Sequence, residues 1–139
     1  MSVRQRCGAS VIIYKENKVL LQQRKDNKCW GYVGGYIEMG EIVEEAAKRE
    51  MFEESGLIAQ SLELFGVFSG PELYHVYPDG NEVHIIDIVF TCNDFTGNLK
   101  AQESEVLDLQ WFDYEHIPEN LSHPIKPALM KFIKTRCPN

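Results

Sequence analysis

The stretch GYIEMGEIVEEAAKREMFEESGL, residues 35–57, decides how the rest of the chain is arranged. Residues 42–54 contain no Gly or Pro and are rich in good helix formers, and Gly56 follows at the usual terminating position, so a helix is predicted here. An apolar stripe with i, i+4, i+8 spacing runs along this helix: Val43, Ala47 and Met51. Such a stripe can anchor the helix on a hydrophobic core.

Three glutamates of this helix, Glu50, Glu53 and Glu54, are related by i, i+3 and i+4 spacing, so they emerge on one face. Like charges at this spacing cost about 0.2–0.5 kcal/mol per pair, and the cluster therefore needs compensation. Hard oxygen ligands on one rigid element suit Mg2+ or Mn2+. The alternative is an acidic face that is only solvated, but the apolar stripe indicates that the glutamates are held beside packed structure.

The same stretch carries a longer pattern, G-x5-E-x7-R-E-U-x-E-E-x-G-U, in which U is an aliphatic residue. Its constrained positions are filled in order by Gly35, Glu41, Arg49, Glu50, Met51, Glu53, Glu54, Gly56 and Leu57. This pattern is the Nudix box, and the chain therefore resembles the Nudix family. So many constrained positions are far more specific than a short glycine motif.

The resemblance covers the whole chain and implies a fold and an activity. The implied fold is α/β, a Nudix α/β/α sandwich with a mixed central sheet, in a single domain at residues 1–139. Nudix enzymes mostly hydrolyse a pyrophosphate bond in a nucleoside diphosphate linked to another group, with Mg2+ or Mn2+. The implied function is a nucleotide pyrophosphohydrolase of the MutT-like or ADP-ribose type. The alternative is a Nudix-fold module that binds or senses a nucleotide without turnover, which a degenerate box would favour.

By resemblance, the metal ion is bound by side chains of the box and by one backbone carbonyl. Glu53 and Glu54 bind the ion directly, and Glu50 either binds it or orients the attacking water. The carbonyl of Gly34, in the glycine pair that precedes the helix, is a further ligand. Ions held in this way would lower the pKa of water, neutralise phosphate charge and align the attack.

Further residues complete the catalytic set that the resemblance implies. Arg49 pairs with Glu41 and fixes the geometry of the carboxylates. The general base is left open between Glu50, Glu53 and Glu105, because its position varies within the family. Glu105 lies upstream of a Trp-Phe pair, at the spacing where many Nudix enzymes carry an additional glutamate.

Three residues outside the box are candidate substrate contacts. Arg24 ends an LLQQR strand, where Nudix proteins often carry an arginine that faces the substrate, so it resembles a phosphate contact; a surface arginine is the alternative. Trp30 can stack on a base or serve as a core or lid aromatic. Glu103 is the second choice after Glu105 in the acidic loop at residues 101–105, and either can be an ordinary surface residue.

Two positions depart from the family pattern, and two others leave the substrate open. Val33 stands where proline is usual before the box, and Ile42 stands where a Ser or Thr often caps the helix. Nudix enzymes that act on ADP-ribose often carry a proline after the box, and those that act on dinucleoside polyphosphates often carry a tyrosine slightly further on. Pro71 and Tyr74 lie close to these two positions, so they do not distinguish the two substrates. The sequence therefore indicates the type of reaction but not the nucleobase of the substrate.

The composition narrows the partners and the location. A net charge of −7 argues against binding to nucleic-acid polymers or to membranes, and leaves a small-molecule nucleotide as the expected substrate. No signal-peptide pattern is seen and the four cysteines are scattered, so we expect a cytoplasmic protein with reduced thiols. A zinc site is not expected, because the histidines are dispersed too. A homodimer is compatible with the resemblance.

The remaining elements follow from apolar runs and turn signals. Strands are expected at residues 7–14, 18–24, 57–68 with a break near Glu63, 84–92 and 106–113, and a helix at residues 122–134. Turns are expected at residues 77–81 and 93–97, and a short helical turn is expected to end at Pro118. Asp87 is notable within the apolar strand at residues 84–92, although one carboxylate can simply face water on the polar side of the pleat.

Overall fold

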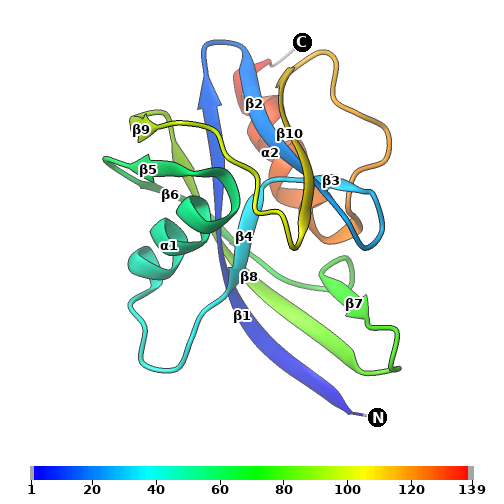
Figure 1. The fold of residues 1–139 in the computed structure, drawn as a ribbon. Helices are drawn as coiled ribbons and strands as arrows, with labels where there is room; N and C mark the ends of the chain where they lie inside the picture. The colour runs from blue at the N-terminus through cyan, green and yellow to red at the C-terminus, as the bar shows by residue number, and fades with distance from the viewer. Residues whose placement is uncertain (1, 138–139) are drawn as a thin grey trace.

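The computed structural model describes residues 2–137, so the ends of the predicted domain, residues 1, 138 and 139, lie outside the described part. In Figure 1, long strands form a sheet with helices on either side. The strands are β1 (Val3–Lys15), β2 (Lys18–Arg24), β3 (Trp30–Gly31), β4 (Val33–Tyr36), β5 (Leu57–Ala59), β6 (Glu63–Phe68), β7 (Tyr74–Val76), β8 (Glu82–Cys92), β9 (Phe95–Gly97) and β10 (Val106–Asp113). The helices are α1 (Val43–Ser55), the 3-10 turn η1 (His123–Ile125) and α2 (Lys126–Arg136).

The central sheet is mixed, as the resemblance implied. Its strand order is β10-β2-β1-β8-β6, and β3, β4 and β7 pair with β2, β1 and β8, respectively. The strands β1 and β8 run parallel over most of their length (Figure 1). The strands β2 and β4 pair with β1, and β6 with β8, in the antiparallel sense. Strands β5 and β9 form a separate two-stranded sheet.

Side chains of β1 alternate between the two faces of the sheet, and each face carries a helix. Val11 and Ile13 pack in one core cluster with Met51 of α1. Ile12, which lies between them in sequence, packs in the other cluster with Phe132 of α2. Because consecutive side chains of a strand point to opposite faces, one apolar run supplies both clusters. The result is the α/β/α sandwich that was predicted.

The strands β1 and β2 form a hairpin and then separate. They pair near the turn, where Tyr14 faces Val19. Further from the turn, β1 pairs with β4, whereas β2 pairs with β3 and β10. Ser10 of β1 and Gln22 of β2 line the same cavity. The separation of the two strands therefore provides the space for a site.

The box helix α1 begins one residue later than predicted. Ile42 is its N-cap residue and makes no side-chain capping bond within the described part of the chain. At the other end, Gly56 adopts a left-handed conformation with φ of 79° and donates its N–H to the Phe52 carbonyl. Glycine takes this conformation without steric cost, which explains the stop. Among residues 2–137, no helix has the length and apolar character needed to cross a membrane.

Several segments differ from the expectations. Residues 93–97, expected as a turn, include strand β9, and the interrupted strand at residues 57–68 is divided between two sheets. Strand β7 was not predicted, because three residues carry too little periodicity. Residues 114–115 form a simple turn in place of the helical turn expected before Pro118. The C-terminal helix starts as η1, which has a proline in its first positions.

Candidate active site

A cavity of about 450 Å3 lies where β1 and β2 separate. Its walls come from these strands, from β4 and α1, and from the segments before β10 and around η1. Five residues predicted for the site line it: Arg24, Gly34, Glu50, Glu54 and Glu105. The volume lies within the range of about 300–1,000 Å3 that is common for small-molecule sites.

The three clustered glutamates of α1 lie at different depths. Glu54 is buried, with 6% of its surface exposed. The exposed fraction of the side chain is 13% for Glu50 and 44% for Glu53. Ala47 and Met51 of the apolar stripe are fully buried and pack α1 against the sheet. The helix therefore presents the three carboxylates from a rigid support.

Glu54 is held by two neutral donors. Its Oε1 accepts a hydrogen bond from Gln22 Nε2 at 3.0 Å and another from the Gly34 N–H at 2.8 Å. Burial raises the pKa of Glu54 to about 8, and Glu50 adds to the rise, whereas the two donors oppose it. Gln22 Oε1 is also buried and has no hydrogen-bond partner among residues 2–137. Gln22 was not predicted, because the contact joins positions far apart in sequence.

Glu50 lies over the glycine pair that precedes α1. A Cβ atom at Gly35 would lie 2.1 Å from Glu50 Oε1, so the carboxylate fills the space that any side chain there would need. This close approach is the physical reason for a glycine at that position of the box. Burial raises the pKa of Glu50, Arg49 opposes the rise, and Glu53 and Glu105 add to it.

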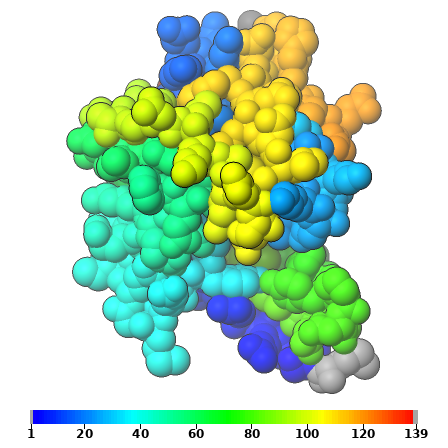
Figure 2. Space-filling model, in the orientation of Figure 1, coloured from blue at the N-terminus to red at the C-terminus, as the bar shows by residue number. Residues whose placement is uncertain are grey.

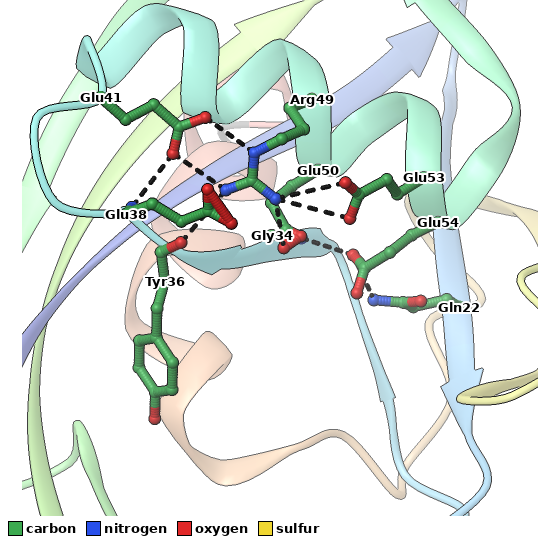
Figure 3. Close-up of polar contacts among 9 residues, drawn as sticks. All are labelled: Gln22, Gly34, Tyr36, Glu38, Glu41, Arg49, Glu50, Glu53 and Glu54. Carbon is green, nitrogen blue, oxygen red and sulfur yellow. Dashed lines mark hydrogen bonds and ion pairs between the residues drawn. The ribbon is translucent and has the colours of Figure 1, made fainter.

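Arg49 connects the carboxylates, as Figure 3 shows. Its Nε and Nη2 donate to the Glu41 carboxylate at 2.7 and 3.0 Å. Its Nη1 lies 3.4 Å from Glu53 Oε1 and 3.5 Å from Glu50 Oε1. Hydrogen bonding to Arg49 lowers the pKa of Glu41 to about 2, and the pKa of Arg49 is raised in return. The structure thus brings together the two residues that the resemblance paired.

The backbone of Gly34 faces the glutamates. Gly34 lies opposite Ser10 in the β1–β4 pair, but its N–H points to Glu54 rather than to β1. In an antiparallel pair, the N–H and carbonyl of one residue point to the same side, so the Gly34 carbonyl lies on the edge facing α1 as well. A Cβ atom at this position would lie 2.2 Å from Ser10 Oγ, which excludes larger residues.

The chemistry of these donors fits a hard divalent cation. Glu50, Glu53 and Glu54 offer carboxylate oxygens, and burial of the first and last makes their charged forms costly without a nearby cation. Within residues 2–137, no three His, Cys, Asp or Glu side chains converge into a metal-binding group as they stand. Glu53 faces Arg49 and Glu54 faces Gln22 instead. The donor set therefore fits in kind, and the ligand roles stay a prediction.

Arg24 and the acidic loop before β10 meet at the cavity. The Lys25 N–H donates to the Glu105 carbonyl at 3.0 Å. Figure 2 shows this loop, in yellow, seated between α1 and the blue segment after β2. Arg24 pairs with Asp26 at 2.9 Å, and about half of each side chain is exposed. The Glu103 carbonyl accepts a bond from Lys25 Nζ, while its side chain is exposed. Glu105 is exposed too, but of the two glutamates it is the one that lines the cavity.

Trp30 packs in the core cluster on the α2 side of the sheet. Only 8% of its surface is exposed, and its ring meets Phe112 edge to face with 5.0 Å between centroids. Its backbone N–H and carbonyl bond to Asn120 and Ser122 at 2.9 and 2.8 Å. This placement agrees with the core role that was the alternative to base stacking.

Asp87 does not face water, which was the simple explanation that the sequence left open for it. It is 6% exposed and lines the cavity. Its Oδ1 accepts a hydrogen bond from Ser10 Oγ at 2.7 Å, and its Oδ2 accepts one from Tyr32 Oη at 2.9 Å. Burial raises the pKa of Asp87, and the two hydroxyl donors oppose the rise. Residue 87 shares its sheet face with Val89, which packs in the α2-side core, and sequence alone does not show that both faces are covered.

Aromatic side chains line another part of the cavity, and no sequence signal pointed to them. Tyr36, His75 and Tyr77 come from separate segments. The hydroxyls of Tyr36 and Tyr77 lie 2.6 Å apart, and burial raises the pKa of Tyr36. The guanidinium of Arg6 lies 3.7 Å from the centroid of the Tyr36 ring. These rings offer flat surfaces next to the polar groups of the site.

Comparison with known proteins agrees with this arrangement. The NUDIX domain family model matches residues 4–133. The ADP-ribose pyrophosphatase of Methanocaldococcus jannaschii is 41% identical over 111 residues, which cover 78% of this chain and 62% of that protein. The NAD-capped RNA hydrolase NudC of Vibrio cholerae is 31% identical over 110 residues, covering 78% and 37%. The chain thus spans less than two thirds of the length of either relative.

A solved structure shares the fold over nearly its whole length. The MutT NUDIX hydrolase from Burkholderia pseudomallei superposes with a TM-score of 0.78 at 28% identity. The superposition covers 91% of this chain and 96% of that chain. The sandwich described above therefore accounts for most of both molecules.

Proposed function

This chain belongs to the Nudix family, and from that premise we propose that it hydrolyses a pyrophosphate bond in a nucleoside diphosphate linked to another group. The observation that carries the proposal is the network in which Arg49 joins Glu41, Glu50 and Glu53 beside the buried Glu54. Glu50 and Glu54 of this group also line a cavity of nucleotide size. A helix whose acidic face was only solvated would not bury two of these carboxylates.

The proposed cofactor is Mg2+ or Mn2+, bound by Glu50, Glu53 and Glu54 with the Gly34 carbonyl. When bound, the ion supplies positive charge to the pyrophosphate and acidifies water. Arg49 orients the carboxylates through its ion pairs, so that they do not turn away from one another. This role makes Arg49 a positioning residue in the proposed mechanism.

The proposed proton acceptor stays open between three glutamates. Burial raises the pKa of Glu50, so its carboxylate is a better proton acceptor than that of an exposed glutamate. Glu53 is the most exposed member of the cluster, with 44% of its side chain in contact with solvent. Glu105 lines the same cavity from the loop before β10. These observations leave all three as candidates for the residue that accepts a proton from water.

Arg24 is the proposed phosphate contact. It lines the cavity, and Glu54 and Glu105 are among the charges that act on it. Its guanidinium is shared with the exposed Asp26, so a phosphate would have to compete with an ion pair that is worth little in solvent. Trp30 is not part of the proposed contact set, because it packs in the core.

The proposed substrate is a small nucleotide of the MutT-like or ADP-ribose type. Two similar proteins carry the names ADP-ribose pyrophosphatase and MutT NUDIX hydrolase. A nucleic-acid polymer is not proposed, because the net charge of −7 disfavours binding to a phosphate backbone. A single domain over residues 1–139 and a cytoplasmic location belong to the same proposal.

A substrate panel tests the function. Purified protein is assayed with Mg2+ or Mn2+ against (d)NTPs, oxidised dGTP, ADP-ribose, nucleotide sugars and dinucleoside polyphosphates, and the nucleotide and phosphate products are measured. Metal-dependent release of a nucleoside monophosphate from a preferred substrate is expected. Binding without turnover across the panel would instead support a nucleotide sensor.

Conservative substitutions test the metal ligands. Glu53→Gln and Glu54→Gln should each lower kcat/KM at least about 100-fold, because even residues that only support metal ligands contribute about 10–100-fold. Thermal unfolding should show that both variants stay folded. Glu44→Gln, at an exposed position of the same helix, is the matched control and should keep full activity. Turnover that survives both changes at saturating Mg2+ would disprove the assignment.

A further inference from the structure

Asp87 is a buried acid without a charged partner. The groups that hold it are two neutral hydroxyls, Ser10 Oγ and Tyr32 Oη. Among residues 2–137, no Lys, Arg or His forms an ion pair with it. A buried carboxylate normally needs a cation or several donors to offset its lost hydration. Hydrogen bonds from two neutral hydroxyls replace only part of the hydration that the carboxylate loses on burial.

The carboxylate can accept further hydrogen bonds from the cavity. Each carboxylate oxygen has two lone pairs, and each oxygen of Asp87 uses one of them for a hydroxyl donor. The residue lines the cavity, and the neighbouring wall includes Gly8. A Cβ atom at Gly8 would lie 3.5 Å from Asp87 Oδ1, so the missing side chain leaves open space next to that oxygen. Each oxygen of Asp87 therefore keeps an acceptor site that a ligand in the cavity could use.

Apolar side chains also line the cavity that Asp87 lines. Leu73, Ile85 and Ile125 line the same cavity. A ring of a nucleoside can lie against such side chains, whereas only a hydrogen-bond donor gains from the carboxylate. Glu50 and Glu54 of α1 line the same cavity as Asp87, so the two acidic regions can contact different parts of one ligand.

We propose that Asp87 is a specificity-determining residue that binds an edge of the nucleotide presenting two hydrogen-bond donors side by side. This inference rests on the proposed function, since it assumes that the cavity takes a nucleotide. Two parts of a nucleotide have this chemistry: the imino and amino groups of a guanine-type base, and the two hydroxyls of ribose. Adenine presents one donor beside one acceptor and does not match a carboxylate in the same way.

Binding of nucleoside monophosphates tests the proposal without requiring turnover. Affinities of the wild-type protein with Mg2+ are measured by calorimetry for GMP, for AMP and for their 2′,3′-dideoxy forms. A preference for GMP over AMP assigns the donor pair to the base, and a preference for ribose over dideoxyribose assigns it to the sugar. At least one preference of about 10- to 100-fold is expected, which is the discrimination of a good bidentate contact.

Asp87→Asn tests whether this residue is the cause. The amide keeps the shape of the side chain, and the Ser10 and Tyr32 hydroxyls can accept as well as donate, so the fold should be retained. Because the amide replaces one acceptor by a donor, the variant should lose most of the wild-type preference. Asp113→Asn, at an exposed position on β10, is the control and should keep that preference.

Gly8→Ala provides a second test that leaves the carboxylate unchanged. The new methyl group would meet its neighbours at 3.4–3.9 Å, which is ordinary van der Waals contact, so folding should be unaffected. The methyl group should weaken binding of the preferred nucleotide more than binding of the nucleotide that lacks the donor pair, because it narrows the approach to Asp87 Oδ1.

The outcomes separate the two proposals. A wild-type protein that binds none of the four ligands, or that shows neither preference, overturns the role of Asp87. A preference that persists in Asp87→Asn also overturns the role of Asp87. Monophosphates contain no pyrophosphate bond, so these results do not depend on hydrolysis. Selective binding together with a silent substrate panel would remove only the proposed hydrolysis.

Discussion

Two buried acids dominate this protein at the scale of single residues. Glu54 and Asp87 are each 6% exposed, and both are held mainly by neutral donors. Burial of a carboxylate costs free energy unless the group is protonated or lies near positive charge. Each acid therefore lowers the stability of the ligand-free protein and gains from a ligand. For Glu54 the suitable ligand is a cation, and for Asp87 it is a pair of donors.

The raised pKa of Glu54 makes stability depend on pH. The folded-state pKa rises from an ordinary 4.5 to about 8, because of burial. Below pH 4.5, Glu54 is protonated in both the folded and the unfolded protein. Between pH 4.5 and 8, the carboxyl loses its proton in the unfolded protein but keeps it in the folded protein. This difference favours the unfolded state, so the free energy of unfolding falls as the pH rises across this range. In EDTA at pH 8.5, the free energy of unfolding of Glu54→Gln should therefore exceed that of wild type by an amount on the order of a few kcal/mol. This difference between the two proteins should shrink as the pH falls towards 4.5.

Urea unfolding of both proteins at the two pH values measures this gap. Glu44→Gln, which changes an exposed carboxylate of α1, should show no such pH-dependent difference. A gap of equal size at both pH values would mean that Glu54 is ionised in the folded protein throughout.

Gly35→Ala tests the contact between Glu50 and the loop before α1. The new Cβ atom would lie 2.1 Å from Glu50 Oε1, so the carboxylate would have to rotate away. Because the end of a flexible side chain can move, we expect a stability cost of about 1 kcal/mol or less, while kcat/KM falls roughly 100-fold through misplacement of the carboxylate. Gly66→Ala on β6, where a Cβ atom would lie 3.1 Å from the Phe68 ring, is the control for activity and should keep the kcat/KM of wild type. Unchanged activity in Gly35→Ala would show that Glu50 needs no fixed position.

At the scale of elements, α1 is well anchored along its length but poorly capped at its start. Ala46, Ala47 and Met51 are fully buried, and Gly56 closes the C-terminus. Ile42 at the N-cap is 65% exposed and cannot accept a bond from the first free N–H groups. Packing, rather than capping, therefore stabilises this helix.

Ile42→Ser should stabilise the protein. A serine hydroxyl at the N-cap accepts a bond from a free N–H of the first turn, which is worth about 1 kcal/mol. The midpoint of urea unfolding should rise, and activity should not change, because Ile42 is exposed and is not among the residues that line the cavity. Met39→Ser, at a fully exposed loop position, is the control and should leave the midpoint unchanged. A lower midpoint for Ile42→Ser would show that the isoleucine packs in solution.

At the scale of the whole molecule, the sheet separates two cores. The core under α1 supports the box helix, and the core under α2 is rich in aromatic rings. Phe132 is 1% exposed and meets the rings of Tyr14, Phe65 and Tyr114 at centroid distances of 5.2–5.9 Å. The second core therefore fixes the C-terminal helix to the sheet without contributing carboxylates to the cluster on α1.

Phe132→Ala should destabilise the whole protein. Loss of a fully buried ring costs about 3–5 kcal/mol, because the cavity left behind collapses only partly. Phe52→Ala, at a position on α1 that is 55% exposed, should change the free energy of unfolding by less than about 0.5 kcal/mol. Chemical denaturation measures both. At temperatures where Phe132→Ala stays folded, its kcat/KM should match wild type, and a large loss would show that the α2 core shapes the site.

Much of the fold and part of the candidate site could be predicted from sequence, for local reasons. Helical spacing alone places Glu50, Glu53 and Glu54 on one face of α1, and the boundaries of β2 and β10 follow from apolar runs between turns. The box pattern paired Arg49 with Glu41, which lie eight positions apart. These features depend on neighbours in sequence, so periodicity and spacing carry the information.

The tertiary structure decided everything that depends on strand order. Glu54 meets Gln22 across 32 positions because α1 packs on the sheet, and Asp87 meets Ser10 across 77 because β1 and β8 are neighbouring strands. The choice of Glu105 over Glu103, and the burial of Trp30, likewise follow from how distant segments pack. Sequence periodicity shows which face of an element a side chain takes, but only the assembled sheet determines what covers that face.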